Sequence, residues 1–152
     1  MKLSSTAFAE GGMLPPRFTC DGTGVSPPLE WEDVPDGVQA FALVCEDPDA
    51  PSGVFTHWLL YNLPAGSREL GEGTPRDEVL SIGARQGRNS FGDVGYGGAC
   101  PPKGDREHRY IFKLHALDAG LAVEPGASRD QLLTAMRDHV LADAQLMGKY
   151  KR

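Results

Sequence analysis

The chain has 152 residues, the length of one domain, and its 40% hydrophobic and 24% charged residues are typical of a folded protein rather than a disordered one. Nineteen glycines and twelve prolines argue against a mostly helical protein. Twenty-one acidic against fifteen basic residues give a net charge of −6, which argues against a nucleic-acid-binding protein. We therefore expect a single domain over residues 1–152.

Three segments have the apolar runs or the alternation that predict β-strands: Phe41–Glu46, His57–Leu63 and Arg109–Leu117. Prolines end the first two, in the turn DPDAP at 47–51 and at Pro64. In the third, every second residue from Tyr110 to Leu114 is aromatic or apolar, so we expect that face to be buried.

A glycine-rich stretch, 83–107, separates the second and third of these strands. It contains seven glycines and the pair Pro101-Pro102. Connections this long are usually functional or disordered in compact domains, and the aromatic residues Phe91 and Tyr96 favour a function.

One helix is clearly predicted, and it lies near the C-terminus. Ser128 and Gln131 have capping-box spacing, and the helical stripe that follows is formed by Leu132, Leu133, Met136 and Val140. Residues 144–150 are compatible with a final strand. The order of the elements, with the strands first and a helix late, predicts a mainly β protein. We expect an antiparallel sheet or sandwich with a peripheral helix.

The sequence has no apolar run near the roughly 18 to 20 residues that cross a bilayer, and no signal-peptide core at its start. We therefore expect a cytoplasmic protein without a membrane span. Its cysteines, Cys20, Cys45 and Cys100, are odd in number and lack CxxC spacing, so we expect three reduced thiols. A single bridge between Cys20 and Cys100 stays open as the alternative.

The most informative polar residues stand at strand ends, since the usual catalytic and nucleotide-binding signatures are absent. Asp47 follows the first strand, His57 begins the second, and His108 precedes the third, with Tyr110 on the same face as His108. If the strands are neighbours, two imidazoles and a phenol can bind an anion while Asp47 orients a histidine. The residues alone leave open that these side chains only cap their own turns and strand ends.

Two other kinds of site rank below anion binding. Two histidines and a carboxylate can hold zinc or iron, but no close histidine spacing supports a metal. A nucleophile beside a base would have to be Cys45, Cys100 or Ser90. We expect His115, on the opposite strand face, and His139, on the late helix, to lie outside any site.

Several longer segments of the sequence together resemble a known protein family. They are CDGTGVSPPLEW (20–31), EDPDAP (46–51), THWLLYNLP (56–64), GYGGACPPKGDREHRYIFKLHALD (95–118) and HVLADAQLMGKYKR (139–152). In this order they resemble the phosphatidylethanolamine-binding protein family, above all its bacterial Raf-kinase-inhibitor-like (YbhB/YbcL-type) branch. The resemblance covers nearly the whole chain.

The resemblance implies a β-sandwich-like fold of two antiparallel sheets with flanking helices and a small pocket for phosphate-like groups, including phosphoethanolamine head groups. It also implies a cis peptide bond between Ala50 and Pro51. Carried over by motif, the ligand-binding residues are Asp47, Pro51, His57, Gly98, Pro102, His108 and Tyr110.

We accordingly expect a non-enzymatic binding module for a small anionic or phosphorylated ligand or a phosphorylated protein partner. The resemblance adds regulation of a kinase or protease as a family role, implies no cofactor or metal, and is compatible with a homodimer. We expect weak phosphate binding that is tighter near pH 6 than near pH 8, because protonated imidazoles are charged donors. The alternative is a hydrolase that uses an Asp47/histidine dyad or a bound metal in the same pocket.

Overall fold

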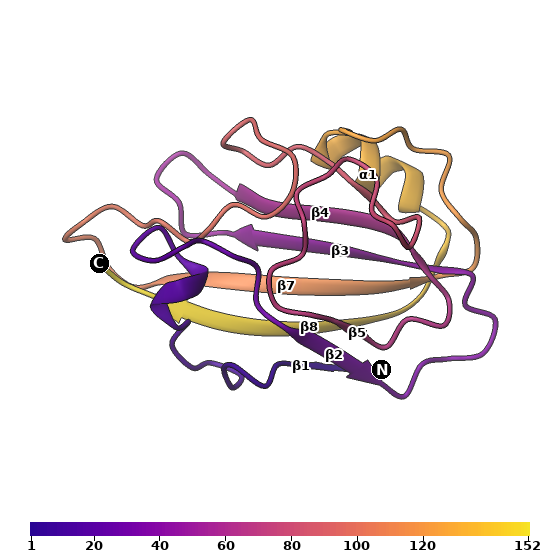
Figure 1. The fold of residues 1–152 in the computed structure, drawn as a ribbon, viewed down its shortest axis with the longest axis horizontal. Coiled ribbons are helices and arrows are strands. Elements are labelled where there is room, and N and C mark those ends of the chain that lie inside the picture. Colours follow the sequence, from indigo (N-terminus) through magenta and orange to yellow (C-terminus); the bar gives the residue numbers. More distant parts are fainter.

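A five-stranded antiparallel sheet carries most of the polar residues singled out above. In the computed structural model, which describes residues 1–152, its strands follow the order β6-β4-β3-β7-β8. They are β3 (Ala40–Asp47), β4 (Phe55–Pro64), β6 (Arg85–Gln86), β7 (His108–Leu117) and β8 (Val140–Tyr150). Figure 1 shows β3 and β7 side by side at the centre of the sheet. The three predicted strands are confirmed, and residues 144–150 end a longer strand.

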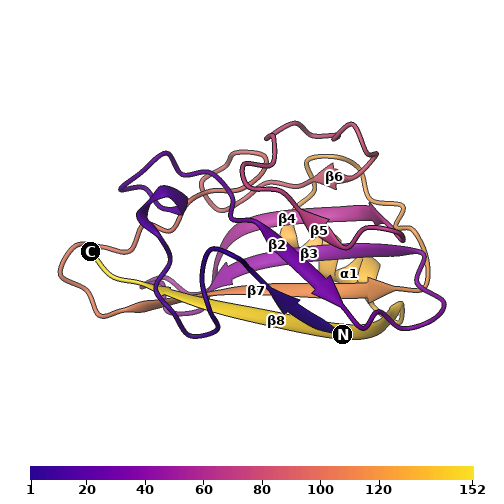
Figure 2. The same ribbon diagram turned by 60° about the horizontal axis from the view of Figure 1, so that its bottom comes forward.

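A smaller antiparallel sheet packs against the large one. Its strands, in the order β1-β2-β5, are β1 (Lys2–Ser4), β2 (Leu29–Glu32) and β5 (Glu69–Leu70). Figure 2 shows β1 and β2 crossing one face of the large sheet. Both sheets contribute to one buried core, in which the rings of Trp31 and Phe41 have centroids 5.5 Å apart. Two antiparallel sheets and little helix confirm the predicted mainly β, sandwich-like fold class.

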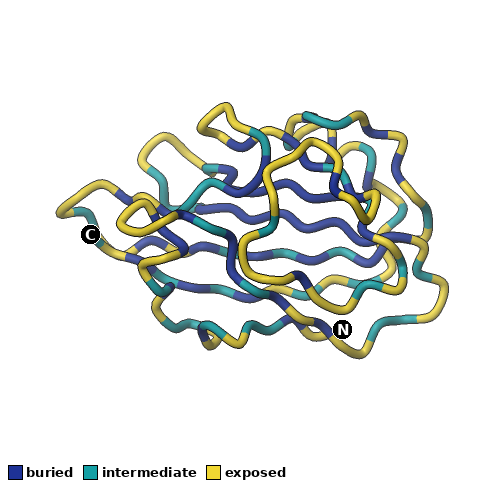
Figure 3. Tube along the Cα trace, in the orientation of Figure 1, coloured by how far each residue is buried: buried dark blue, intermediate teal, exposed yellow.

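The single α-helix, α1 (Arg129–Met136), covers the opposite face of the large sheet. Its Leu132 and Met136 join a second buried cluster with Val44 of β3 and Leu59 of β4. Since both faces of β3 are covered, all eight of its residues are buried, as the dark central strands in Figure 3 show. This double cover explains why the β3 sequence is apolar on both of its faces.

The helix has the predicted capping box but ends one turn earlier than the apolar stripe indicated. After Met136 the chain turns at Asp138, whose φ of 69° lies in the left-handed region. Val140 therefore begins β8, and His139 lies in the connecting turn rather than on the helix. The eight residues of α1 are too few to cross a bilayer, and no other helix is longer.

The outer edge of β8 is paired with the N-terminal segment 11–14. The amide of Gly11 donates to the carbonyl of Met147 at 2.8 Å, and the amide of Leu14 donates to the carbonyl of Lys149 at 2.8 Å. The amide of Lys149 returns a bond to the carbonyl of Gly12 at 2.9 Å. Segment 11–14 thus satisfies backbone groups that a bare edge strand would expose.

Candidate functional site

A cavity of about 240 Å³ opens at the end of the large sheet where β3 ends and β7 begins. This end of the sheet lies on the left of Figure 1. Because β3 is antiparallel to both neighbours, its last residue, Asp47, lies beside the first residues of β4 and β7. The cavity is lined by Asp47, Ala50, Pro51, Ser52, Phe55, His57, Phe91, Cys100, Pro101, Pro102, His108 and Tyr110. The strand ends therefore converge as the sequence argument required.

Six of the seven predicted site residues line this cavity, and Gly98 does not. A Cβ atom at Gly98 would lie 3.1 Å from the carbonyl carbon of Thr19, so this glycine lets its segment pass close to the chain after η1 (Pro16–Phe18). Sequence reasoning missed the lining residues Phe55 and Ser52. For Phe91, the aromatic content of the glycine-rich stretch was a signal, but nothing in the sequence placed it at this cavity.

His108 is held between two carboxylates. Its Nδ1 lies 2.7 Å from Oδ2 of Asp47, and its Nε2 lies 2.8 Å from Oδ2 of Asp105. Burial disfavours a charge on the ring, but the hydrogen bonds to Asp105 and Asp47 outweigh burial and raise the pKa of His108. The ring therefore stays an imidazolium to a higher pH than an ordinary histidine, with both N–H groups donated to carboxylates. Asp105 was not among the predicted site residues.

His57 has the opposite electrostatic character. Its Nδ1 lies 2.7 Å from the carbonyl oxygen of Gly97, which can only accept, so Nδ1 carries the hydrogen. Burial lowers the pKa of His57 against the opposing effects of this hydrogen bond and of Asp47. The neutral ring keeps a lone pair on Nε2, which has no hydrogen-bond partner within the chain. His57 thus offers a ligand an acceptor.

Asp47 and Tyr110 complete the polar part of the cavity. The Asp47 side chain is buried, and its Oδ1 accepts a hydrogen bond from the backbone amide of Asp49 at 2.7 Å. Burial and the charge of Asp47 raise the pKa of Tyr110, so the phenol remains protonated and can donate. The ring of Tyr110 meets His57 edge-on, with centroids 5.2 Å apart.

The turn that carries Asp47 is fixed from outside the cavity by an ion pair. Asp49 accepts hydrogen bonds from the backbone amide, Nε and Nη2 of Arg109, at 3.0, 2.9 and 2.9 Å. These contacts lower the pKa of Asp49 to about 2. The predicted cis bond between Ala50 and Pro51 is wrong, because the chain has no cis peptide. The amide of Asp49, bonded to Asp47, closes the turn with a trans proline.

Aromatic side chains form one wall of the cavity. The rings of Phe55 and Phe91 pack edge to face with centroids 4.8 Å apart, and Phe91 also contacts the ring of His57 at 5.7 Å. Phe91 is 49% exposed, so a large part of its ring remains open to solvent beside the cavity. The site therefore combines a carboxylate, two differently charged histidines and an apolar wall.

Comparison with known proteins shows the family of this chain. The family model described as phosphatidylethanolamine-binding protein matches residues 4–151. The chain belongs to the phosphatidylethanolamine-binding protein family.

Three relatives match over nearly their full lengths. A UPF0098 protein of Methanothermobacter thermautotrophicus is 49% identical over 152 residues, which cover 100% of this chain and 99% of the relative. The crystal structure of Escherichia coli YbcL has a TM-score of 0.93 at 36% identity, covering 99% of this chain and 98% of YbcL. A phosphatidylethanolamine-binding protein homologue of Chlamydia trachomatis has a TM-score of 0.90 at 42% identity, with 99% and 97% covered.

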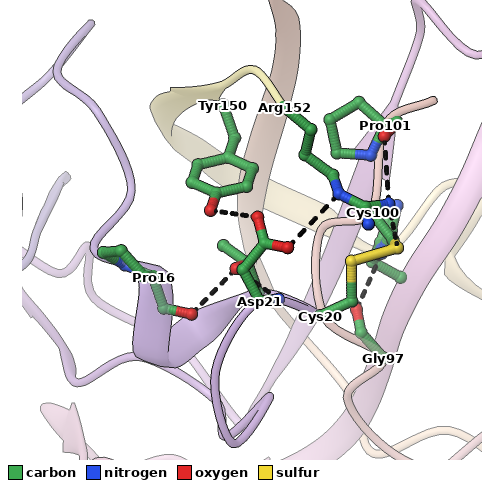
Figure 4. Close-up of a disulfide and its surroundings, with 10 residues drawn as sticks. Pro16, Cys20, Asp21, Gly97, Cys100, Pro101, Tyr150 and Arg152 are labelled. Atoms are coloured by element: carbon green, nitrogen blue, oxygen red, sulfur yellow. Dashed lines mark hydrogen bonds and ion pairs between the residues drawn. A yellow bond between two sulfur atoms is a disulfide. The ribbon is translucent and has the colours of Figure 1, made fainter. Parts of the chain in front are cut away.

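In this phosphatidylethanolamine-binding protein family member, two of the three cysteines are bonded, so the prediction of three reduced thiols is wrong. Cys20 and Cys100 form a disulfide across 80 residues of sequence, with Cα atoms 5.3 Å apart. An isolated β-bridge, a backbone pairing between Thr19 and Ala99, brings the two segments together. The cysteine spacing could not reveal this pairing. Figure 4 shows the disulfide and its neighbours, and Cys45 remains a buried free thiol. The cysteine count therefore no longer supports a reducing compartment.

The structure brings together no group of three or more His, Cys, Asp or Glu side chains that could hold a metal ion. His115 and His139 lie away from the cavity and face carboxylates of their own, Asp143 and Asp118.

Proposed function

We propose that this protein is a non-enzymatic binding module whose cavity holds a phosphate-like group, on a small ligand such as a phosphoethanolamine-type head group or on a phosphorylated partner. The observation that carries the proposal is the convergence of Asp47, His57, His108 and Tyr110 on one cavity of about 240 Å³. The phenol of Tyr110 can donate to a phosphate oxygen, and the positive charge of His108 favours an anion although its N–H groups are already donated. Membership of the phosphatidylethanolamine-binding protein family supports the same ligand chemistry.

The charges around the cavity favour a singly protonated phosphate over the dianion. No lysine or arginine lines the cavity, and His108, its cation, already donates both N–H groups to carboxylates. Asp47 and Nε2 of His57 are acceptors, which repel bare phosphate oxygens but can accept a P–OH group. Since the second pKa of a phosphate monoester is about 6, the monoanion that fits this cavity grows in abundance as the pH falls.

Two features support a binding role over catalysis. Cys100, which lines the cavity, is tied up in the disulfide and carries no free thiolate. Ser52 is the other residue of the lining with an aliphatic hydroxyl or a thiol, and its side chain makes no hydrogen bond to a base. Acyl or phosphoryl transfer needs a nucleophile activated by a base within hydrogen-bond reach. The role of a kinase or protease regulator rests on family analogy and adds a protein partner to the proposal.

Calorimetric titration with inorganic phosphate and with phosphoethanolamine, at pH 6 and pH 8, tests the proposal. We expect weak binding that is several-fold tighter at pH 6 and is lost in His108→Ala. The matched control is His139→Ala, which removes a histidine paired with an aspartate outside the cavity. If His108→Ala and the unchanged protein bind these ligands with equal affinity, the binding site does not lie in this cavity.

An ester and phosphoester hydrolysis assay tests the non-enzymatic part of the proposal. We expect no turnover with metal-free or metal-loaded protein. Activity that purifies with the protein and disappears in His57→Ala would instead establish the hydrolase.

A further inference from the structure

The disulfide forms part of the cavity wall and is open to solvent. Cys100 lines the cavity together with Pro101 and Pro102, which follow it in the chain. Both half-cystines, Cys20 and Cys100, are exposed. An exposed disulfide can be reached by an external thiolate, whereas most structural disulfides are shielded from thiol exchange.

The two sulfur atoms of this disulfide have different electrostatic surroundings. Nη1 of Arg152 lies 3.1 Å from Sγ of Cys100 and 3.4 Å from the carbonyl oxygen of Pro101. Cys20 has no such cation, and the residue after it is the acidic Asp21. A thiolate on Cys100 would therefore face a guanidinium, and a thiolate on Cys20 would lie beside a carboxylate.

The guanidinium is held in this position by further contacts, which Figure 4 shows. Nε of Arg152 lies 3.4 Å from Oδ1 of Asp21, and the hydroxyl of Tyr150 donates to Oδ2 of the same carboxylate at 2.6 Å. The amide of Gly104 also donates to the carbonyl of Arg152 at 3.2 Å. In the oxidised protein the Arg152 guanidinium therefore already lies beside the Cys100 sulfur.

We propose that the Cys20–Cys100 disulfide is a thiol–disulfide exchange site in which a dithiol reductant attacks Cys20 and Cys100 leaves beside Arg152. In the first step, a reductant thiolate forms a bond to Sγ of Cys20, and the electron pair of the broken S–S bond goes to Sγ of Cys100. In the second step, the other thiolate of the reductant displaces Cys20, which takes up a proton. The reductant is oxidised to its disulfide and the protein is reduced by two electrons.

Exchange at this site changes the cavity, a consequence that rests on the proposed function. Reduction replaces a neutral sulfur in the wall with an anionic one and removes the covalent tie between the segments of Cys20 and Cys100. Both changes oppose the binding of a phosphate-like anion. By linkage, bound phosphate must slow or disfavour reduction to the same extent.

Trapping the released thiolate tests the direction of exchange. The oxidised protein is treated with glutathione in the presence of iodoacetamide, and the cysteine-containing peptides are identified by mass spectrometry. We expect glutathione on Cys20 and the alkyl group on Cys100, in about tenfold excess over the reverse pattern. Equal labelling of the two cysteines, the reverse pattern, or a native disulfide that resists reduction until the protein is unfolded would overturn the proposal.

Two arginine variants separate the guanidinium effect from a general loss of positive charge. In Arg152→Gln we expect release of Cys100 to slow about threefold, because the leaving thiolate loses its cation. The matched control, Arg137→Gln, removes an exposed arginine outside the cavity and should leave the rate unchanged. An unchanged rate in Arg152→Gln would refute the role of this residue.

Phosphate calorimetry on the oxidised and reduced protein tests the coupling to the cavity. We expect binding to be at least about threefold weaker after reduction. If both forms bind equally, the coupling is refuted. If neither form binds while the trapping pattern holds, the proposed function fails and the exchange site stands.

Discussion

Replacing Asp47 with asparagine should lower the pKa of His108 while preserving the shape of the site. The amide oxygen of Asp47→Asn can keep the hydrogen bond from the amide of Asp49, and its NH2 group then faces Nδ1 of His108. A neutral His108 accommodates this change, because Nδ1 can accept while Nε2–H still donates to Asp105. The substitution thus removes a charge without leaving a buried polar group unpaired.

The expected shift follows from the two carboxylates around the ring. An opposite charge within about 4 to 6 Å moves a pKa by roughly one to three units. Because Asp105 remains on the other ring nitrogen, we take the lower end of this range, so the loss of Asp47 should weaken the preference for the charged ring of His108 by ~1.4 kcal/mol and lower its pKa.

The sign of the stability effect is fixed by the direction of the shift. A raised folded-state pKa contributes stability that is fully present below the unfolded pKa and is lost as the pH rises through the folded pKa. Asp47→Asn should therefore cost the most stability near pH 5 to 6 and less above pH 8.

The assay is an NMR titration of the histidine Cε1–H signals, which the four histidines of the chain make tractable. Asp118→Asn, at the exposed pair with His139, is the control and should leave His108 unchanged. A pKa of His108 that stays constant or rises in Asp47→Asn would refute the charge assignment in the cavity.

Three further substitutions test residues that support the structure around the site. Gln86→Leu should cost about 3 kcal/mol in urea unfolding, because the buried Gln86 side chain pairs with an indole N–H and two backbone carbonyls that would lose their partner. Asp49→Asn should remove stability that the protein otherwise loses as the pH falls from about 4 to 2, seen as a flatter acid unfolding curve, since the ion pair with Arg109 depresses the Asp49 pKa. Gly22→Ala should lower the melting temperature because a Cβ there would lie 2.5 Å from a backbone oxygen, whereas Gly66→Ala, with nothing within 4 Å, should not.

The sequence predicted the parts of the site that lie next to strand ends. Asp47, His57 and His108 stand at ends of strongly patterned strands, which local signals indicate, and their convergence depends on the antiparallel pairing of these strands. The DPDAP turn and the HRY segment carried the resemblance to the family, and this resemblance led us to expect a pocket formed by these residues.

The remaining parts depend on contacts that no local pattern encodes. The pairing of Cys20 with Cys100 requires two loops to meet across 80 residues, and the backbone bridge that joins them carries no side-chain pattern. No sequence pattern places Asp105 at the second nitrogen of His108, a contact that depends on the fold of the loop before β7. In the smaller sheet, β1 and β5 have three and two residues, which is too few for alternation to predict a strand.

The pairing of segment 11–14 with β8 bears on how the chain reaches its folded state. A nascent chain that has emerged only as far as α1 leaves the edge of β7 without its partner β8, although β7 carries His108 and Tyr110. Closing this edge requires β8, and β8 in turn requires residues from the opposite end of the sequence. Pairings between such distant segments form slowly, and an open strand edge is a template for association with other chains. Aggregation during synthesis should therefore begin at β7, before the cavity exists.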